Sequence, residues 1–218
     1  MTMDEISNHR SVAVVGLGHV GLTTAVAFAR AGLHVIGFDV DSERIDELGL
    51  GYDRMSDVNV SELDYPMLDF VSETAALIEA DFYIIAVSTH VDAFGHPDLD
   101  DLLLASKLIG PTLRRGDIVV YVSTVYPGAI EEACIPALER SSQLSARRDF
   151  AVGYSPERAD FGNKRRSLQS VQRVVAGQDQ NTCNAIAAIF DIIVAAGIHK
   201  APSIRVAETA KIIENAQR

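Results

Sequence analysis

Residues 11–30, SVAVVGLGHVGLTTAVAFAR, decide the fold of this chain. A short run of β-branched apolar residues leads into closely spaced glycines and then into an alanine-rich segment with helical spacing, which predicts a strand, a tight turn and a helix. Gly16 permits the turn, Gly18 allows a pyrophosphate to approach the backbone, and Gly21 allows the helix to pack against the strand. We therefore expect the phosphates of a dinucleotide on the first amides of this helix. The residues of this segment expected to form the cofactor site are Gly16, Gly18, His19, Val20 and Gly21.

A carboxylate follows at the distance that such a site requires. Asp39 ends the second apolar run, about 20 residues after the glycines, where an acid binds the ribose hydroxyls of adenosine. Because a carboxylate there repels a 2′-phosphate, the sequence predicts NAD rather than NADP. Arg44 is a nearby cation that would accommodate such a phosphate. The alternative is that the glycines only serve a turn and Asp39 only caps the helix that begins near Ser42.

Short apolar runs recur along the rest of the chain, each followed by a longer segment with helical spacing or a polar face. This alternation predicts an α/β chain with a Rossmann-like, doubly wound, mostly parallel sheet and helices on both faces. The expected strands are residues 11–16, 34–39, 82–87, 118–123, 150–154, 173–177 and 197–201. The expected helices are residues 20–31, 42–48, 73–80, 99–113, 128–140, 181–194 and 203–218, with an irregular excursion at residues 49–69.

Polar residues lie where the expected strands end, which is where ligands bind in a doubly wound sheet. Val87 ends one strand and is followed by Ser88 and Thr89, and Ser123 and Thr124 close the next. A single Ser or Thr before a helix is more often an N-cap than a ligand. Together with the glycine turn and its acid, these residues indicate an NAD-dependent oxidoreductase, and they do not name its substrate.

Five motifs in a fixed order carry a resemblance to a known family. VGLGHVGL, AVSTHVD, STVYPG, YSPERADFGNK and AETAKIIENAQR, spread over residues 11–218, resemble the UDP-glucose/GDP-mannose dehydrogenase family. The pieces GYDRMSDV, STVYPG and SPERADFGNK are most similar to the branch that acts on UDP-N-acetylhexosamines for capsule or antigen polysaccharides. The resemblance implies oxidation of the C6 alcohol of a UDP-sugar, with UDP-N-acetylglucosamine or UDP-N-acetylgalactosamine as the best guess, to a carboxylate by two NAD.

The resemblance also implies roles for individual residues. Thr124 would hold a water near C6 and Glu157 would lie close to the sugar, which the segment Arg158, Ala159 and Asp160 would surround. Lys211 and Asn215 would both point at the C6 oxygen, and their spacing of four places them on one helical face. Together they would stabilise the charge that develops on that oxygen. The alternative is a surface helix in which Lys211 pairs with Glu208 or Glu214.

The chain departs from the family pattern in three places. Phe161 stands where many relatives have a second glutamate, and His90 stands where they have a proline. The family's nucleophilic cysteine belongs to a downstream segment that this chain does not contain, and we expect Cys134 and Cys183 to be inert packing residues. We therefore expect the chain alone to bind NAD weakly and to turn over no sugar.

The expected organisation follows from the same motifs. Residues 1–10 form a tail, residues 11–202 an NAD-binding domain, and residues 203–218 the first turns of a connecting helix through which the complete enzyme dimerises; the UDP-binding domain is absent. Two other functions stay open: a non-catalytic nucleotide-binding module, and a hydroxyacid-type NAD dehydrogenase.

Composition narrows the class of protein. The chain has 218 residues, 48% of them hydrophobic, a net charge of −11 and a pI near 4.9, so we expect no nucleic-acid partner. We also expect no membrane association, because there is no apolar run of about 20 residues and no secretory leader at the start. Two cysteines show no metal-ligand spacing with the six histidines. We therefore expect a cytoplasmic protein without a metal.

Overall fold

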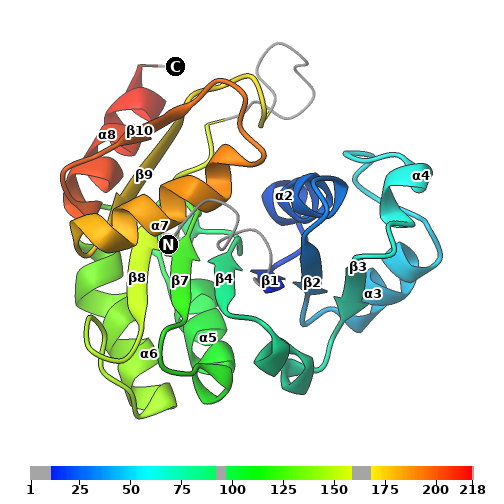
Figure 1. The fold of residues 1–218 in the computed structure, drawn as a ribbon, viewed down its shortest axis with the longest axis horizontal. Coiled ribbons are helices and arrows are strands. Elements are labelled where there is room, and N and C mark those ends of the chain that lie inside the picture. The colour runs from blue at the N-terminus through cyan, green and yellow to red at the C-terminus, as the bar shows by residue number, and fades with distance from the viewer. Residues whose placement is uncertain (1–10, 92–96, 159–167, 218) are drawn as a thin grey trace.

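The computed structural model describes residues 11–91, 97–158 and 168–217. Its centre is an eight-stranded sheet with the order β10-β9-β8-β7-β4-β1-β2-β3 (Figure 1). Neighbouring strands are parallel except β8 and β9, which are antiparallel, so the predicted mostly parallel sheet is confirmed. The strands are β1 (Ser11–Val15), β2 (His34–Phe38), β3 (Leu68–Val71), β4 (Phe82–Ile85), β7 (Ile118–Tyr121), β8 (Ala151–Tyr154), β9 (Arg173–Gly177) and β10 (Ile198–Lys200).

Helices cover both faces of this sheet, as predicted (Figure 1). One core cluster contains side chains of α2 (His19–Arg30), α3 (Ser42–Gly49) and α7 (Gln180–Asp191). The other contains side chains of α5 (Asp100–Ile109), α6 (Ile135–Ser142) and α8 (Ile204–Ala216). Alternate strand residues supply the two clusters: Val12 and Val14 face the first, and Ala13 and Val15 face the second. Burial on both faces explains why the strands read as continuous apolar runs.

The excursion at residues 49–69 is more regular than predicted. It contains the short helix α4 (Val60–Leu63) and the first residues of β3, which pairs in parallel with β2 at the edge of the sheet. The prediction missed β3 because an edge strand is only partly buried: Leu68 is buried, but Asp69 is exposed. A run of four residues with one acid has no strong strand signal.

Several predicted helices are shorter or tighter than the sequence suggested. Residues Thr74–Glu79 form a 3₁₀ helix, and a second 3₁₀ turn at Gly110–Thr112 extends α5. A π-helical turn at Ile130–Cys134 precedes α6, where Pro136 lacks the amide that would continue a regular ladder. Residues His90–Val91 (β5) and Pro97–Asp98 (β6) form a small antiparallel ribbon that the sequence analysis did not include.

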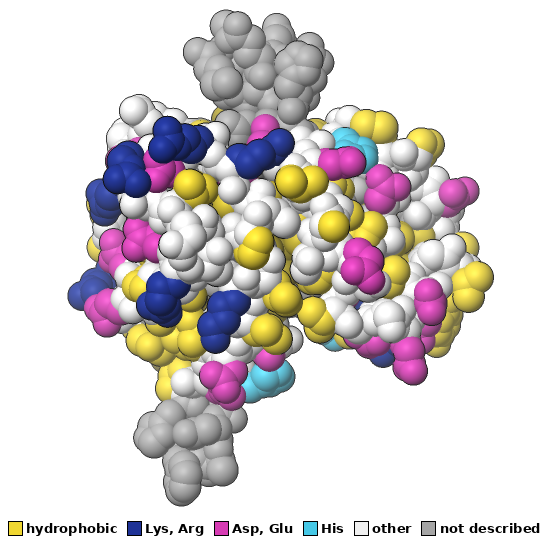
Figure 2. Space-filling view, turned by 90° about the horizontal axis from the view of Figure 1, so that it is seen from below, with side chains coloured by type: hydrophobic (Ala, Val, Ile, Leu, Met, Phe, Trp, Pro, Cys, Tyr) yellow, Lys and Arg dark blue, Asp and Glu magenta, His cyan; other side chains and the backbone are white. Residues whose placement is uncertain are grey.

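The surface agrees with the acidic composition. On the face seen in Figure 2, basic side chains are interspersed with acidic ones on the left, and acidic side chains are scattered over the right. Within the described part of the chain, no helix has both the length and the apolar character that crossing a membrane requires.

Candidate cofactor and sugar site

The glycine turn between β1 and α2 has the geometry that its spacing predicts. Gly16 has a φ of 92°, in the left-handed region, so any side chain there would be strained. A Cβ on Gly21 would lie 1.7 Å from the Gly16 carbonyl oxygen, whereas a Cβ on Gly18 would meet nothing within 4 Å. Gly21 therefore allows α2 to approach the turn, and Gly18 leaves open space at the N-terminus of the helix.

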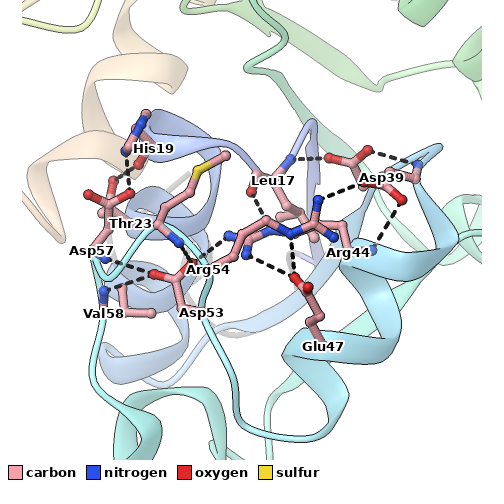
Figure 3. A network of polar contacts seen from close by, with 12 residues as sticks. Leu17, His19, Thr23, Asp39, Arg44, Glu47, Asp53, Arg54, Asp57 and Val58 are labelled. Carbon is pink, nitrogen blue, oxygen red and sulfur yellow. Dashed lines mark hydrogen bonds and ion pairs between the residues drawn. The ribbon is translucent and has the colours of Figure 1, made fainter.

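Asp39 ties the end of β2 to the glycine turn. Its carboxylate accepts hydrogen bonds from the amide of Leu17 at 2.7 Å and from the amide of Asp41 at 3.0 Å (Figure 3). The cap of α3 is Asp41, whose side chain accepts from the amides of Glu43 and Arg44. The alternative in which Asp39 is merely a helix cap is therefore wrong, because the capping position lies two residues later.

Arg44 does not extend over the ribose position as a free cation. Its side chain is buried, and its Nη2 donates to the Asp53 carboxylate at 2.7 Å while its Nε donates to the Leu17 carbonyl at 3.2 Å. Arg54 is the arginine that lies more openly at the same cavity, with its side chain 36% exposed. The sequence analysis named only Arg44 and missed Arg54, which lies in the irregular excursion.

Two adjoining cavities run along the carboxyl ends of the strands and share residues of the glycine turn and of the loop after β4. Of the residues predicted to bind the cofactor, all but Gly21 line one or both cavities, and Gly21 packs beneath the turn. The first cavity is lined by Gly16, Gly18, Asp39, Arg44, Val87 and Ser88. The second is lined by Gly18, His19, Val20, Val87, Ser88, Thr89, Ser123, Thr124 and Glu157.

Hydroxyl groups join the two loops that form the second cavity. Thr89 Oγ1 donates to the Thr124 carbonyl at 2.8 Å, and Ser123 Oγ donates to the Val87 carbonyl at 2.5 Å. Each of these two hydroxyls bonds to the other loop, so neither acts as the N-cap of the helix that follows it. The wall of the cavity is thereby fixed by contacts between strand ends that lie far apart in the sequence.

Glu157 reaches the second cavity from the end of β8, and a buried arginine holds it there. Arg173 Nη1 donates to Glu157 Oε2 at 2.8 Å, and its Nε and Nη2 donate to the side chain and carbonyl of Ser155 at 2.7 and 3.1 Å. The guanidinium lies 4.1 Å from the ring centre of Phe190. Sequence reasoning missed Arg173, and its only signal was a charged residue at the start of an apolar strand.

Helix α8 brings Lys211 to the same place. The buried Lys211 Nζ donates to the Glu157 carbonyl at 2.6 Å. The helix is anchored by Glu208, whose carboxylate accepts from the amides of Gly128 at 2.6 Å and Ile130 at 3.1 Å; burial raises the pKa of this carboxyl. Asn215 lies one turn further on and is exposed.

Of the residues predicted to surround the sugar after Glu157, the structure describes only Arg158. Arg158 donates to the Glu214 carboxylate at 3.0 and 3.2 Å, so Glu214 has a partner other than the one considered for it. Ala159, Asp160 and Phe161 lie outside the described residues. Among the residues that the structure describes, no group of three or more His, Cys, Asp or Glu side chains is placed to hold a metal ion.

Both cysteines are buried, and we expect them to be unreactive in the native chain. Burial raises the pKa of the Cys134 thiol to about 12 and also raises the pKa of Cys183. Because the thiolate is the nucleophile, neither side chain should react with iodoacetamide at pH 8 on the time scale on which a free thiol does. Mass spectrometry of the alkylated chain tests this, with urea-unfolded protein as the control in which both must react.

Comparison with known proteins identifies the family. The profile of the UDP-glucose/GDP-mannose dehydrogenase family, NAD binding domain, matches residues 10–194. The chain belongs to this family. Protein CapL of Staphylococcus aureus is 47% identical over 210 residues, which are 96% of this chain and 49% of that protein. The UDP-N-acetyl-D-glucosamine 6-dehydrogenase of Salmonella typhi is 45% identical over 208 residues, or 95% of this chain and 49% of that protein.

A solved structure agrees with the assignment to this dehydrogenase family. The UDP-D-ManNAc dehydrogenase from Pyrococcus horikoshii matches with a TM-score of 0.89 and 29% identity, over 95% of this chain and 50% of that one. The resemblance, the Rossmann-like fold and NAD as cofactor are thus confirmed. The chain spans about half the length of the curated relatives that it matches.

Proposed function

We propose that this chain is the cofactor-binding half of a UDP-N-acetylhexosamine 6-dehydrogenase, with UDP-N-acetylglucosamine as the first substrate to test. The observation that carries the proposal is the pair of adjoining cavities leading from Asp39, past the glycine turn, to Thr124 and Glu157. The likeness to a UDP-N-acetyl-D-glucosamine 6-dehydrogenase at 45% identity supports the choice of sugar.

The residues present fit NAD. Gly18 leaves open space beside the N-terminus of α2, where a pyrophosphate binds the helix amides. Asp39 lines the first cavity and offers a carboxylate to the adenosine ribose. Arg44 Nη1 is buried without a hydrogen-bond partner among the described residues and lies 3.9 Å from Glu47 Oε2, so Arg44 contributes positive charge beneath this cavity. The nicotinamide end would then lie in the second cavity, beside Ser123 and Thr124.

The chain's own residues define the reacting end of the site. Bound NAD supplies the acceptor for the electrons that leave the alcohol carbon. We assign the Glu157 carboxylate a place beside the sugar, with Arg173 fixing its orientation at 2.8 Å. Thr124 is assigned to hold a water in the same cavity, and Lys211 and Asn215 are assigned as donors to the C6 oxygen. The hydrogen bond from Lys211 Nζ to the Glu157 carbonyl holds the ammonium group of Lys211 next to the main chain of Glu157.

Asp39 is expected to set the preference for NAD. In Asp39→Ser, the loss of two ribose hydrogen bonds should weaken NAD binding by about tenfold, and the loss of the negative charge should bring NADP closer to NAD in affinity. Isothermal titration of both dinucleotides measures the ratio. Asp179→Ser is the matched control, because Asp179 caps α7 through the Thr182 amide and does not line either cavity. An unchanged NAD to NADP ratio in Asp39→Ser would count against the assignment.

Turnover distinguishes the proposed activity from a binding module. The 218-residue chain is expected to bind NAD and to form no NADH with UDP-sugars. A version joined to the second half of a relative is expected to form two NADH per UDP-N-acetylglucosamine oxidised. If the joined version forms NADH from a hydroxyacid, a hydroxyacid-type dehydrogenase is favoured. If the joined version forms no NADH from any UDP-sugar, a non-catalytic binding module is favoured. Dimerisation through residues 203–218 and the cytoplasmic location stay predictions.

A further inference from the structure

Residues 51–58, here called the 51–58 loop, contribute part of the wall of the first cavity. Arg54 and Met55 line that cavity together with Val87 and Leu104. The loop lies beside the glycine turn although at least 30 residues separate the two in sequence (Figure 3). Neither its sequence motif nor the proposed function assigns a role to any of its side chains.

Asp53 is the residue that organises this loop. Its side chain is 2% exposed, and its Oδ1 accepts from Arg44 Nη2 at 2.7 Å and from the Met55 amide at 3.1 Å. Its Oδ2 accepts from the amides of Asp57 at 2.8 Å and Val58 at 3.3 Å. Burial opposes ionisation, but Arg44 and the backbone donors outweigh it and hold the pKa of this carboxyl below its usual value.

Side chains of the loop and Arg44 connect the loop to the cofactor site at three points. Arg44, held by Asp53, also donates to the Leu17 carbonyl within the glycine turn at 3.2 Å. Asp57 bonds to His19, the first residue of α2, at 2.5 Å. Arg54 pairs with Asp41 at 3.3 Å, next to the end of β2. Asp53 takes part in the first contact through Arg44, and Asp57 and Arg54 make the other two from the loop whose backbone Asp53 holds.

We propose that Asp53 is a positioning residue for the adenosine end of the NAD site, holding the 51–58 loop as the wall against which adenosine binds. The inference rests on the proposed NAD-binding function and adds a residue outside the glycine turn and the ribose carboxylate. Without the ionised carboxylate, Arg44 loses its charged partner, and one of the two oxygens that accept from Arg44 and from the amides of Met55, Asp57 and Val58 is lost. The backbone around Met55 is then no longer held at the cavity, although the Arg54 side chain keeps its pairs with Glu47 and Asp41.

Binding of NAD and of ADP-ribose to Asp53→Asn tests this role. Because the wall is at the adenosine end, both ligands should bind about tenfold more weakly, and by the same factor. The control is Glu62→Gln, since Glu62 lies in the same excursion, pairs with Arg30 and accepts from the Asn59 amide at the start of α4, yet lines neither cavity. Thermal unfolding of both variants separates stability from affinity: both are expected to unfold at lower temperature, but Glu62→Gln should bind within twofold of the original chain.

A second measurement covers the case in which Asp53→Asn does not fold. In the unaltered chain, ADP-ribose is expected to slow hydrogen exchange at the amides of Met55, Asp57 and Val58, because adenosine bound against the wall makes local opening of the loop less frequent. Equal affinity losses in Asp53→Asn and Glu62→Gln, unchanged affinity in Asp53→Asn, or no slowing of exchange would each overturn the role of Asp53 while leaving NAD binding intact. Failure of the unaltered chain to bind NAD or ADP-ribose would overturn the proposed function as well.

Discussion

Gly21→Ala is expected to destabilise the chain by about 3 kcal/mol and to remove its measurable NAD binding. The added Cβ would lie 1.7 Å from the Gly16 carbonyl oxygen and 2.9 Å from its carbonyl carbon. Both are backbone atoms of the tight turn, so neither can rotate away as a side chain would. Helix α2 must move outward or the turn must open, and either change displaces the amides that bind pyrophosphate. Thermal unfolding should show a decrease of about 10 °C in the melting temperature.

Gly18→Ala is the matched control, because it adds the same methyl group to the same turn. Nothing lies within 4 Å of that Cβ, and Gly18 has a φ of −74°, which alanine adopts without strain. Its stability should stay within about 0.5 kcal/mol of the original chain. NAD affinity should still decrease, because the methyl group would occupy space at both cavities. Equal stability of Gly21→Ala and Gly18→Ala would contradict the assigned roles of these glycines.

Arg173→Met is expected to destabilise the chain by about 3 kcal/mol, because it removes a buried cation that bonds to a largely buried carboxylate. The side chains of Arg173 and Glu157 are 3% and 10% exposed. Methionine keeps much of the packing against Phe190 but loses the donors to Glu157 and Ser155. The change in the free energy of unfolding is measured by urea titration.

Arg158→Met provides the comparison, because Arg158 also pairs with a glutamate close to the site. Its pair with Glu214 is more open to solvent, with side chains 29% and 21% exposed. Exposed ion pairs contribute about 1 kcal/mol or less, so this variant should lose much less stability than Arg173→Met. If the two variants unfold at the same urea concentration, the buried pair is not the stronger contact that its geometry indicates.

The features predicted correctly were those with a local cause. The glycine spacing determines the turn, and burial on both faces makes the central strands apolar, so both are visible in a short window of sequence. The edge strand β3 was missed because it lacks that burial. The antiparallel pairing of β9 with β8 has no local signature, since a buried strand has the same composition in either direction.

The sequence by itself determined the α/β class, the dinucleotide turn with Asp39, and the strand-end residues that line the two cavities. Tertiary structure alone decided the partners of the charged groups: Asp53 with Arg44, Arg173 with Glu157, and Lys211 with the Glu157 carbonyl. The physical reason is the distance along the sequence between the residues that determine each feature. A turn depends on the conformations of adjacent residues, whereas the partner of a buried charge depends on which distant segment packs beside it, and any of the chain's 19 basic and 30 acidic residues is a candidate until the fold brings two of them together.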